Sequence, residues 1–450
     1  MISVLVPVIL LLLIILIKKI PYIGGNISAA LVICGLSAFL LGGVYNPITW
    51  IIGWIDGIDK ISWVLALILF GSIYAETQVE LGTMETVLES MRARFGHSPK
   101  GLVSAVIISL AIAGSLLGDA IASATVVGVL IIKALHELKM TGEQISATIV
   151  MGACLGSIMP PITQALFMSS SLIGLKSPDP AVNIGYFTVG LGTVLVCIYA
   201  SKIFIKINSL PEDLIPNKSA TEILIEGWKT LVPLCVLIVI IVLRSGFKIE
   251  ILDVLDPIFS PIRNLPIIKG IDFAIVKAIL VSTVISFFFN KVRKNGLEII
   301  KRGIINIKMS FTILIFAGLM IGAFYNAGQI AVVQNFAQQL SPNVLKVGGA
   351  GAMVLIGMLT GSQTTTQTSI FTFFGPALVA SGVNPVYAAV AGAHLAMAGQ
   401  GLPPADLTTF VVSGLVGGIL GIKVDPIRSM IYSMFMCIYF LIIGFIFMYI

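Results

Sequence analysis

Charged residues are scarce in this sequence. Only 11% of its 450 residues are Asp, Glu, Lys or Arg, against about 25% in a soluble globular domain. Hydrophobic residues make up 57% of the chain, and the mean hydropathy is +1.06. Because so few charged groups cannot cover a water-facing surface, the composition argues against a soluble enzyme. It predicts an all-α polytopic protein of the inner membrane, with apolar helices that each cross a hydrocarbon core of about 30 Å.

Motifs for catalysis, nucleotide binding and metal binding are also missing. The five cysteines lie in apolar runs and none forms a CxxC pair, so they indicate neither disulfides nor a metal site. The chain has no nucleophile triad, Walker motif or GxGxxG, which argues against an enzyme and an ATP-driven pump. Basic residues cluster between apolar runs and form no arginine-rich patch, so the formal charge of +6 does not indicate a nucleic-acid partner.

The apolar segments occur in the same order in two halves of the chain. The first half, 1–207, is expected to contain scaffold spans within 1–77, an arm helix at 79–95, a hairpin at 101–135, a broken helix at 144–172 and a span at 183–206. A cytoplasmic linker is expected at 208–225. The second half, 226–450, is expected to contain a hairpin at 347–380, a broken helix at 385–420 and a last span at 429–449. This order predicts two structural repeats.

A residue-level match supports the repeats. Gly114-Ser115 is followed by Gly128, and Gly361-Ser362 is followed by Gly375, in both cases fourteen positions after the first glycine. Each pair then leads to a double proline inside an apolar span, at 160–161 and at 403–404.

The basic residues predict how the repeats lie in the membrane. If Lys18 and Lys19 are cytoplasmic, most other basic residues fall on the same side, and the loop 245–270 is the exception. The residues expected on the cytoplasmic side include Arg92, Arg94, Lys100, Lys133, Lys139, Lys202 and Lys206. The two hairpins then enter from opposite sides, which is the inverted-repeat plan of many secondary transporters.

Polar residues sit at the expected turns of both hairpins. Asp119 follows Gly118 in the first, where a carboxylate at membrane depth would face a cation, a partner or water, or would cap a helix. The second carries seven consecutive hydroxyl or amide side chains, Ser362 to Thr368, which fit a Na⁺ and a carboxylate or else bind helices together. The double prolines break their helices, and the freed carbonyls can bind cations. Glu76 and His394 are weaker candidates, and a packed core position is the simpler interpretation of His394.

At these segments the chain resembles the large membrane subunit of TRAP transporters, the DctM-like permeases. The resemblance is densest in "RFGHSPKGL", "GDAIASATVVG" and "GACLGSIMPPI", and in "GVNPVYAAVAGAHLAMAGQGLPPADLTTF". Glu76 also falls where the family has a Glu. The resemblance implies an elevator-type transporter that takes up a small organic anion, such as a C4-dicarboxylate, with Na⁺. It further implies an extracytoplasmic solute-binding protein and a small membrane subunit as partners.

Several positions depart from the family pattern. Ser362-Gln363 stands where the family has Asp-Pro, and Asp119 where it has Ser. Ile162 and Asp406 also replace family residues after the double prolines. The coupling ion is therefore open between Na⁺ and H⁺. The second half also resembles gluconate-type (GntP-like) permeases, so a stand-alone carboxylate:cation symporter without a binding protein is the alternative function.

The expected site combines the two hairpins and the two breaks. No cofactor is expected apart from the coupling ion, which we expect near Asp119, Ser362 and Thr364. The expected substrate- and ion-binding residues are Asp119, Ser123, Thr125, Ser157, Thr163, Ser362, Gln363, Thr364, Thr365, Thr366, Gln400, Asp406 and Thr408.

Overall fold

The computed structural model describes residues 2–17, 19–210, 217–247 and 249–450. All regular secondary structure in these ranges is helical. Six helices are long and apolar enough to cross a membrane, or up to eight if each of two sharply bent pairs counts as one span. The prediction of an all-α polytopic membrane protein is therefore confirmed.

The helices of the first half follow the expected order of parts. They are α1 (Ile2–Leu16), α2 (Ile27–Leu41), α3 (Pro47–Lys60), α4 (Ser62–Leu81), α5 (Thr83–Phe95), α6 (Pro99–Leu117), α7 (Ala120–Val126), α8 (Gly128–Glu137), α9 (Gly142–Ile158), α10 (Gln164–Leu172) and α11 (Asp179–Ile203).

In the described part of the second half there are twelve further helices, with short 3₁₀ turns between α12 and α14 and a π-helical segment, Gln367–Phe371, after α19. The helices are α12 (Ala220–Phe247), α13 (Asp256–Phe259), α14 (Ala274–Phe287), α15 (Asn290–Lys294), α16 (Gly296–Asn326), α17 (Gln329–Gln339), α18 (Pro342–Thr360), α19 (Gln363–Thr366), α20 (Thr372–Ala380), α21 (Pro385–Gly401), α22 (Leu407–Leu420) and α23 (Pro426–Tyr449).

Two predicted boundaries are wrong. The arm helix does not begin at 79, because Gly82 adopts a left-handed φ of 85° that ends α4 and lets α5 begin. The linker 208–225 is shorter than predicted, since α12 begins at Ala220; its residues 211–216 lie outside the described part of the chain. Sequence reasoning also missed α3, a helix that Asn46 caps and whose two aspartates, Asp56 and Asp59, interrupt the apolar pattern.

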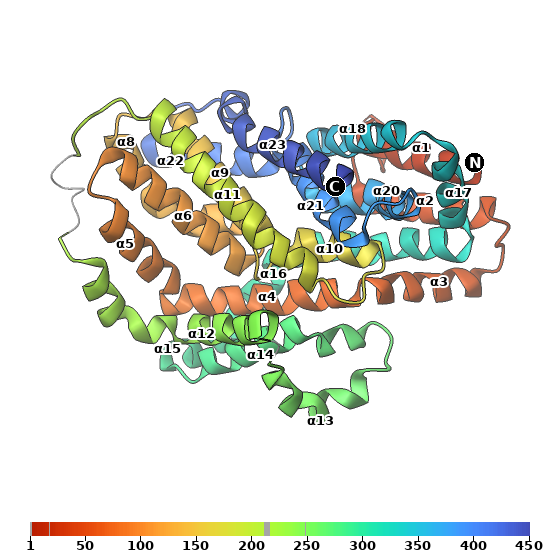
Figure 1. Cartoon of the computed structure of the whole chain (residues 1–450), viewed down its shortest axis with the longest axis horizontal. Coiled ribbons are helices and arrows are strands. Elements are labelled where there is room, and N and C mark those ends of the chain that lie inside the picture. Colours follow the sequence, from red (N-terminus) through yellow and green to blue (C-terminus); the bar gives the residue numbers. More distant parts are fainter. Residues whose placement is uncertain (1, 18, 211–216, 248) are drawn as a thin grey trace.

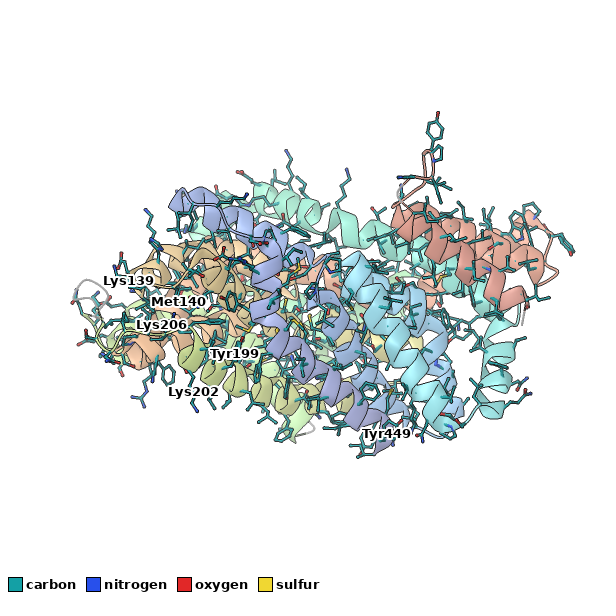
Figure 2. The ribbon with its side chains drawn as sticks, turned by 90° about the horizontal axis from the view of Figure 1, so that it is seen from above. Lys139, Met140, Tyr199, Lys202, Lys206 and Tyr449 are labelled. Atoms are coloured by element: carbon teal, nitrogen blue, oxygen red, sulfur yellow. The ribbon has the colours of Figure 1, made fainter. Side chains whose placement is uncertain are left out.

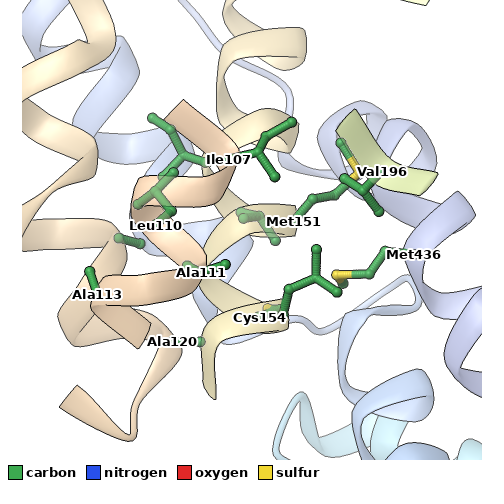
Figure 3. Packing of buried hydrophobic residues seen from close by; sticks show 14 of the residues in the cluster. Ile107, Leu110, Ala111, Ala113, Ala120, Met151, Cys154, Val196 and Met436 are labelled. Carbon is green, nitrogen blue, oxygen red and sulfur yellow. The ribbon is translucent and has the colours of Figure 1, made fainter. Parts of the chain in front are cut away.

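Helices α6, α9, α11 and α23 pack side by side, and α12, α14 and α15 line the opposite side of α4 (Figure 1). Figure 3 shows the apolar contacts within the first group, where Ile107 and Leu110 of α6 meet Met151 and Cys154 of α9, with Met436 of α23 beside them. All five side chains are fully buried. Because burial of one such side chain contributes about 1.5–3 kcal/mol, this group behaves as one packed unit.

The repeated parts recur at one constant spacing of 243 residues. This spacing relates Gly118 to Gly361, Gly114 to Gly357, and the first double proline to the second. Gly118 and Gly361 both end a helix with a left-handed φ, 67° and 62°. The predicted match of Gly114 to Gly361 is therefore wrong by one helical turn, because Gly361 corresponds to Gly118. A Gly-Ser pair occurs at both predicted sites, but the positions that match are the two glycines that end a helix just before the residue that caps the next helix.

The hairpins run inward from opposite ends of the molecule. Helix α6 starts at the end where α5 lies, and α18 starts at the end where α17 lies (Figure 1). Lys139, Lys202 and Lys206, which we expect on one side of the membrane, lie together at one end, and Tyr449 lies far from them (Figure 2). The inverted orientation of the repeats across the membrane stays a prediction.

Candidate functional site

The first hairpin turns at Gly118 and Asp119. The N–H of Gly118 donates to the carbonyl of Gly114 at 2.8 Å, which closes α6. Asp119 then caps α7, because its Oδ1 accepts from the N–H of Ala122 at 2.7 Å. The cap that we considered is thus present, yet the Asp119 residue is also exposed. The exposed side of the Asp119 carboxylate can therefore contact a ligand while the residue caps α7.

The second hairpin has the same turn with a hydroxyl in place of the carboxylate. Ser362 caps α19 by accepting from the N–H of Thr365 at 3.2 Å. Thr366 donates its hydroxyl to the carbonyl of Ser362 at 2.9 Å, and the Thr365 hydroxyl donates to the Ser362 Oγ at 3.0 Å. Several hydroxyls of the polar run therefore satisfy the hairpin's own backbone and side chains.

Each double proline separates two helix halves. The peptide bonds Pro160-Pro161 and Pro403-Pro404 are both cis. After the first, Thr163 caps α10 by accepting from the N–H of Leu166 at 3.4 Å. After the second, Asp406 caps α22 and accepts from the N–H groups of Thr408 and Thr409 at 3.1 Å each, and from the Thr409 hydroxyl.

Paired glycines let each hairpin lie directly against the break of its own repeat. A Cβ on Gly114 would come within 2.6 Å of the Cα of Gly156, and a Cβ on Gly357 within 2.6 Å of the Cα of Gly399. Such close backbone contact requires glycine on both helices. The tip of the second hairpin is also held there by Gln400, whose Oε1 accepts from the N–H of Gln363 at 2.9 Å.

Helix α10 of the first repeat binds the second hairpin. The Gln164 Nε2 donates to the hydroxyl of Thr364 at 2.9 Å. One turn further, the Gln367 Nε2 donates to the carbonyl of Ala165 and to the Ser169 hydroxyl, both at 2.7 Å. These buried bonds connect the first break to the second hairpin, so that the polar parts of the two repeats form one unit.

Two cavities share a wall at the hairpin tips. The larger, about 300 Å³, lies between the first hairpin, α4 and α16, and the smaller, about 100 Å³, lies between the two tips. Asp119, Ile121 and Gln164 line both. The other polar side chains of the lining are Ser72, Glu76, Thr125 and Asn306 in the larger cavity and Ser362, Gln363, Thr364, Gln400 and Thr408 in the smaller.

The two carboxylates of the lining differ in their surroundings. Glu76 forms an ion pair with Arg302 at 3.0 Å and accepts from the Asn306 amide at 2.8 Å. Arg302 also pairs with Glu80 at 2.9 Å, which fastens α4 to α16. Asp119 forms no ion pair within the described ranges. The Asp119 carboxylate is therefore open to a ligand, whereas Glu76 is already paired with Arg302, which it shares with Glu80.

The structure brings only part of the predicted site together. Asp119, Thr125, Ser362, Gln363, Thr364, Gln400 and Thr408 line the two cavities. The remaining predicted residues are Ser123, Ser157, Thr163, Thr365, Thr366 and Asp406, which are buried, bond to neighbouring groups of their own segments and do not line either cavity. His394 is fully buried beside Thr188, and it too lies away from both cavities.

Sequence reasoning missed three polar lining residues, Ser72, Gln164 and Asn306. Gln164 directly follows the predicted Thr163, so its place beside the first double proline was a usable signal. Asn306 gave no such signal, because it reaches the cavity only through the packing of α16 on α4. The assembled lining of hydroxyls, amides and one uncompensated carboxylate suits recognition of a polar solute by hydrogen bonds.

Comparisons with known proteins agree on the fold and the family. No curated protein matches the chain. Two solved structures share the fold: the Alcanivorax borkumensis YdaH transporter (13% identity, TM-score 0.61, 88% of this chain and 86% of that one) and Neisseria gonorrhoeae MtrF (14% identity, TM-score 0.58, 88% and 82%). The family model described as "Tripartite ATP-independent periplasmic transporter, DctM component" matches residues 6–450. The chain therefore belongs to the DctM family of tripartite ATP-independent periplasmic (TRAP) transporters.

Proposed function

We propose that this chain imports a small organic anion of C4-dicarboxylate size together with Na⁺, and that the solute binds between the two hairpin tips. The observation that carries the proposal is the convergence of both hairpins and both helix breaks on two joined cavities. The polar groups of that lining come from segments far apart in the sequence, such as Asp119, Gln164, Thr364 and Gln400. Such convergence on one concave site is typical of ligand binding.

Family membership indicates the general class of function, the location and the kinds of partner. DctM proteins are multi-pass proteins of the inner membrane that carry out TRAP-type secondary transport of organic acids, and they are transporters rather than enzymes. The family also implies a solute-binding protein and a small membrane subunit as partners. The coupling ion, the solute and the movement that we propose go beyond what family membership indicates.

Neutral oxygens support the choice of Na⁺. The hydroxyls of Ser362 and Thr364 lie at the wall of the smaller cavity, and Asp119 adds a carboxylate on the opposite hairpin. A monovalent cation near Asp119 would also reduce the electrostatic cost of a nearby anion, which for two like charges about 5 Å apart is about 3 kcal/mol at an effective dielectric constant of 20. Binding of the cation and binding of the anion are therefore expected to favour each other.

Hydrogen bonds within the site support an elevator-type movement. The bonds Gln164–Thr364 and Gln363–Gln400 join hairpins and breaks to one another, whereas α4 and α16 form one wall of the larger cavity and bond to each other through Arg302. We propose that the hairpins, α9–α11 and α21–α23 move as one unit against a scaffold that contains α4 and α16. Such rigid-body movement of one bundle against another is a common form of alternating access.

The test is uptake of radiolabelled organic acids into proteoliposomes under an imposed Na⁺, proton or choline gradient. The chain would be reconstituted alone and with its small subunit and solute-binding protein. The proposal predicts uptake that needs the Na⁺ gradient and is lost in the Thr364→Val variant. Uptake driven equally by a proton gradient in choline would refute Na⁺ coupling. Full uptake by the chain alone would favour the stand-alone symporter instead.

A further inference from the structure

The charge of the site is unusual for a pocket that takes an organic anion. Asp119 and Glu76 are the charged residues of the two linings, and Glu76 is already paired with Arg302. Neither lining contains a Lys, Arg or His. A solute with carboxylates alone would therefore lie near an uncompensated Asp119, where no basic side chain offsets the repulsion.

Unused hydrogen-bond acceptors occur in the same wall. Gln363 is only 8% exposed and lines the smaller cavity, yet its Oε1 accepts no hydrogen bond in the described structure. Asp119 has one bond from the backbone of Ala122. One N–H of the neighbouring Gln164 amide is already donated to Thr364. Because a buried acceptor without a donor is costly, this wall favours a ligand that brings N–H donors.

An ammonium group meets both requirements. It carries one positive charge and three N–H donors, and it accepts none. Placed beside Asp119 it would compensate the carboxylate, and it could donate to the buried Gln363 amide oxygen once that amide turns toward the cavity. The Thr364 hydroxyl accepts from Gln164 and can still donate to the carboxylate of the same solute.

We infer that the organic acid carried by this protein bears an amino group, and that Asp119 and Gln363 recognise its ammonium. The inference rests on the proposed function and specifies its substrate class as an amino-dicarboxylate or a similar zwitterionic acid. A Na⁺ held by Asp119 is the competing occupant, and the test below separates the two.

The experiment compares acids that differ only in the amino group. Thermal unfolding of the purified full chain is followed in NaCl and in choline chloride while L-aspartate, succinate, L-glutamate or glutarate is titrated. The concentration for half-maximal stabilisation reports affinity without any dependence on a solute-binding protein. The inference predicts that each amino acid acts at a concentration at least about ten-fold lower than its deaminated partner, which corresponds to about 1.4 kcal/mol.

Two variants of Asp119 keep the helix cap while they remove the charge. Asn and Ser are both good capping residues, so Asp119→Asn and Asp119→Ser retain the acceptor for the Ala122 N–H. Both are expected to reduce the preference for the amino form to about one-fold. Asp425→Asn is the matched control, because Asp425 caps α23 outside both cavities, and it should leave the preference unchanged.

Three results would overturn the inference. If succinate stabilised the unmodified chain at the same concentration as L-aspartate, the inference would have no basis. Loss of the Na⁺ requirement in Asp119→Asn with the amino preference intact would assign Asp119 to Na⁺ and leave the proposed function standing. No stabilisation by any of the four acids in either salt, together with no uptake of organic acids by the complete transporter, would refute the proposed function as well.

Discussion

Three glycines test how closely the hairpin tips fit the helix breaks. Gly118, Gly361 and Gly421 all end a helix with nearly the same left-handed φ, between 62° and 67°. They differ in what a Cβ would meet. At Gly421 it meets nothing within 4 Å, at Gly118 it meets Ile162 Cγ2 at 3.1 Å, and at Gly361 it would lie 1.9 Å from the carbonyl oxygen of Ala405.

The expected costs of substitution by Ala form a graded series. Gly421→Ala carries only the penalty of a left-handed L-residue, about 1–2 kcal/mol. Gly118→Ala adds a shift of a few tenths of an ångström at Ile162, about 1 kcal/mol more. Gly361→Ala must separate the hairpin tip from backbone at the second break, which adds about 3 kcal/mol or more. Only this last change should also abolish uptake, because it displaces Ser362 and Gln363 from the cavity wall.

Thermal unfolding of the three variants in detergent, followed by tryptophan fluorescence, would provide the comparison. The account predicts the order Gly421→Ala, Gly118→Ala, Gly361→Ala from the smallest loss of midpoint to the largest. Equal losses for the three variants would mean that backbone conformation alone sets the cost. A stable and active Gly361→Ala protein would refute the close fit between the second hairpin and its break.

Three other changes are expected to have distinct effects. Gln164→Leu removes the donor to Thr364, and uptake in proteoliposomes should fall at least about ten-fold while the protein stays folded; unchanged uptake would contradict a role for the bridge. Ser171→Ala removes the partner of the Trp63 indole N–H, a 2.9 Å bond between α10 and α4, and should cost about 1 kcal/mol of stability. The lost bond should also shift Trp63 emission in a protein whose other tryptophans are Phe; an unaltered spectrum would contradict this contact. Burial raises the pKa of Asp272, but hydrogen bonds from Arg263 and Lys277 outweigh it and leave that pKa lowered. A group whose pKa is lowered in the folded state stabilises the protein at pH values above its usual pKa of about 4, and this stabilisation is lost as the pH falls. The unfolding midpoint of Asp272→Asn should therefore fall less steeply with decreasing pH than that of the unmodified protein. Parallel curves for the two proteins would contradict this.

Local sequence signals predicted the architecture well. Glycines at the turns, double prolines in apolar runs and the polar run Ser362 to Thr368 are short patterns with direct backbone consequences, and the structure has helix ends at the predicted turns and breaks. The register between the repeats was wrong by one turn, because two Gly-Ser pairs look alike although only Gly361 adopts the left-handed conformation.

The residues of the site were harder to predict, because whether a residue lines a cavity depends on the direction in which its side chain faces. Ser123 and Thr125 belong to the same short helix, but only Thr125 reaches a cavity, while Ser123 is buried and donates to the carbonyl of Ala120. Asp406 likewise uses its carboxylate oxygens as hydrogen-bond acceptors in the cap of α22. The pairing of Glu76 with Arg302 joins residues that are remote in sequence, and no local pattern indicates it.

Protection of a single cysteine tests most directly whether the solute binds between the hairpin tips. Thr125→Cys would place a thiol on the larger cavity, and Cys235→Ser would remove the native cysteine that is exposed. The account predicts that maleimide labelling of the cysteine at 125 slows several-fold when the transported acid and Na⁺ are both present, and returns to its basal rate in choline. A labelling rate that stays constant while the same acid saturates uptake would contradict a binding site between the hairpin tips.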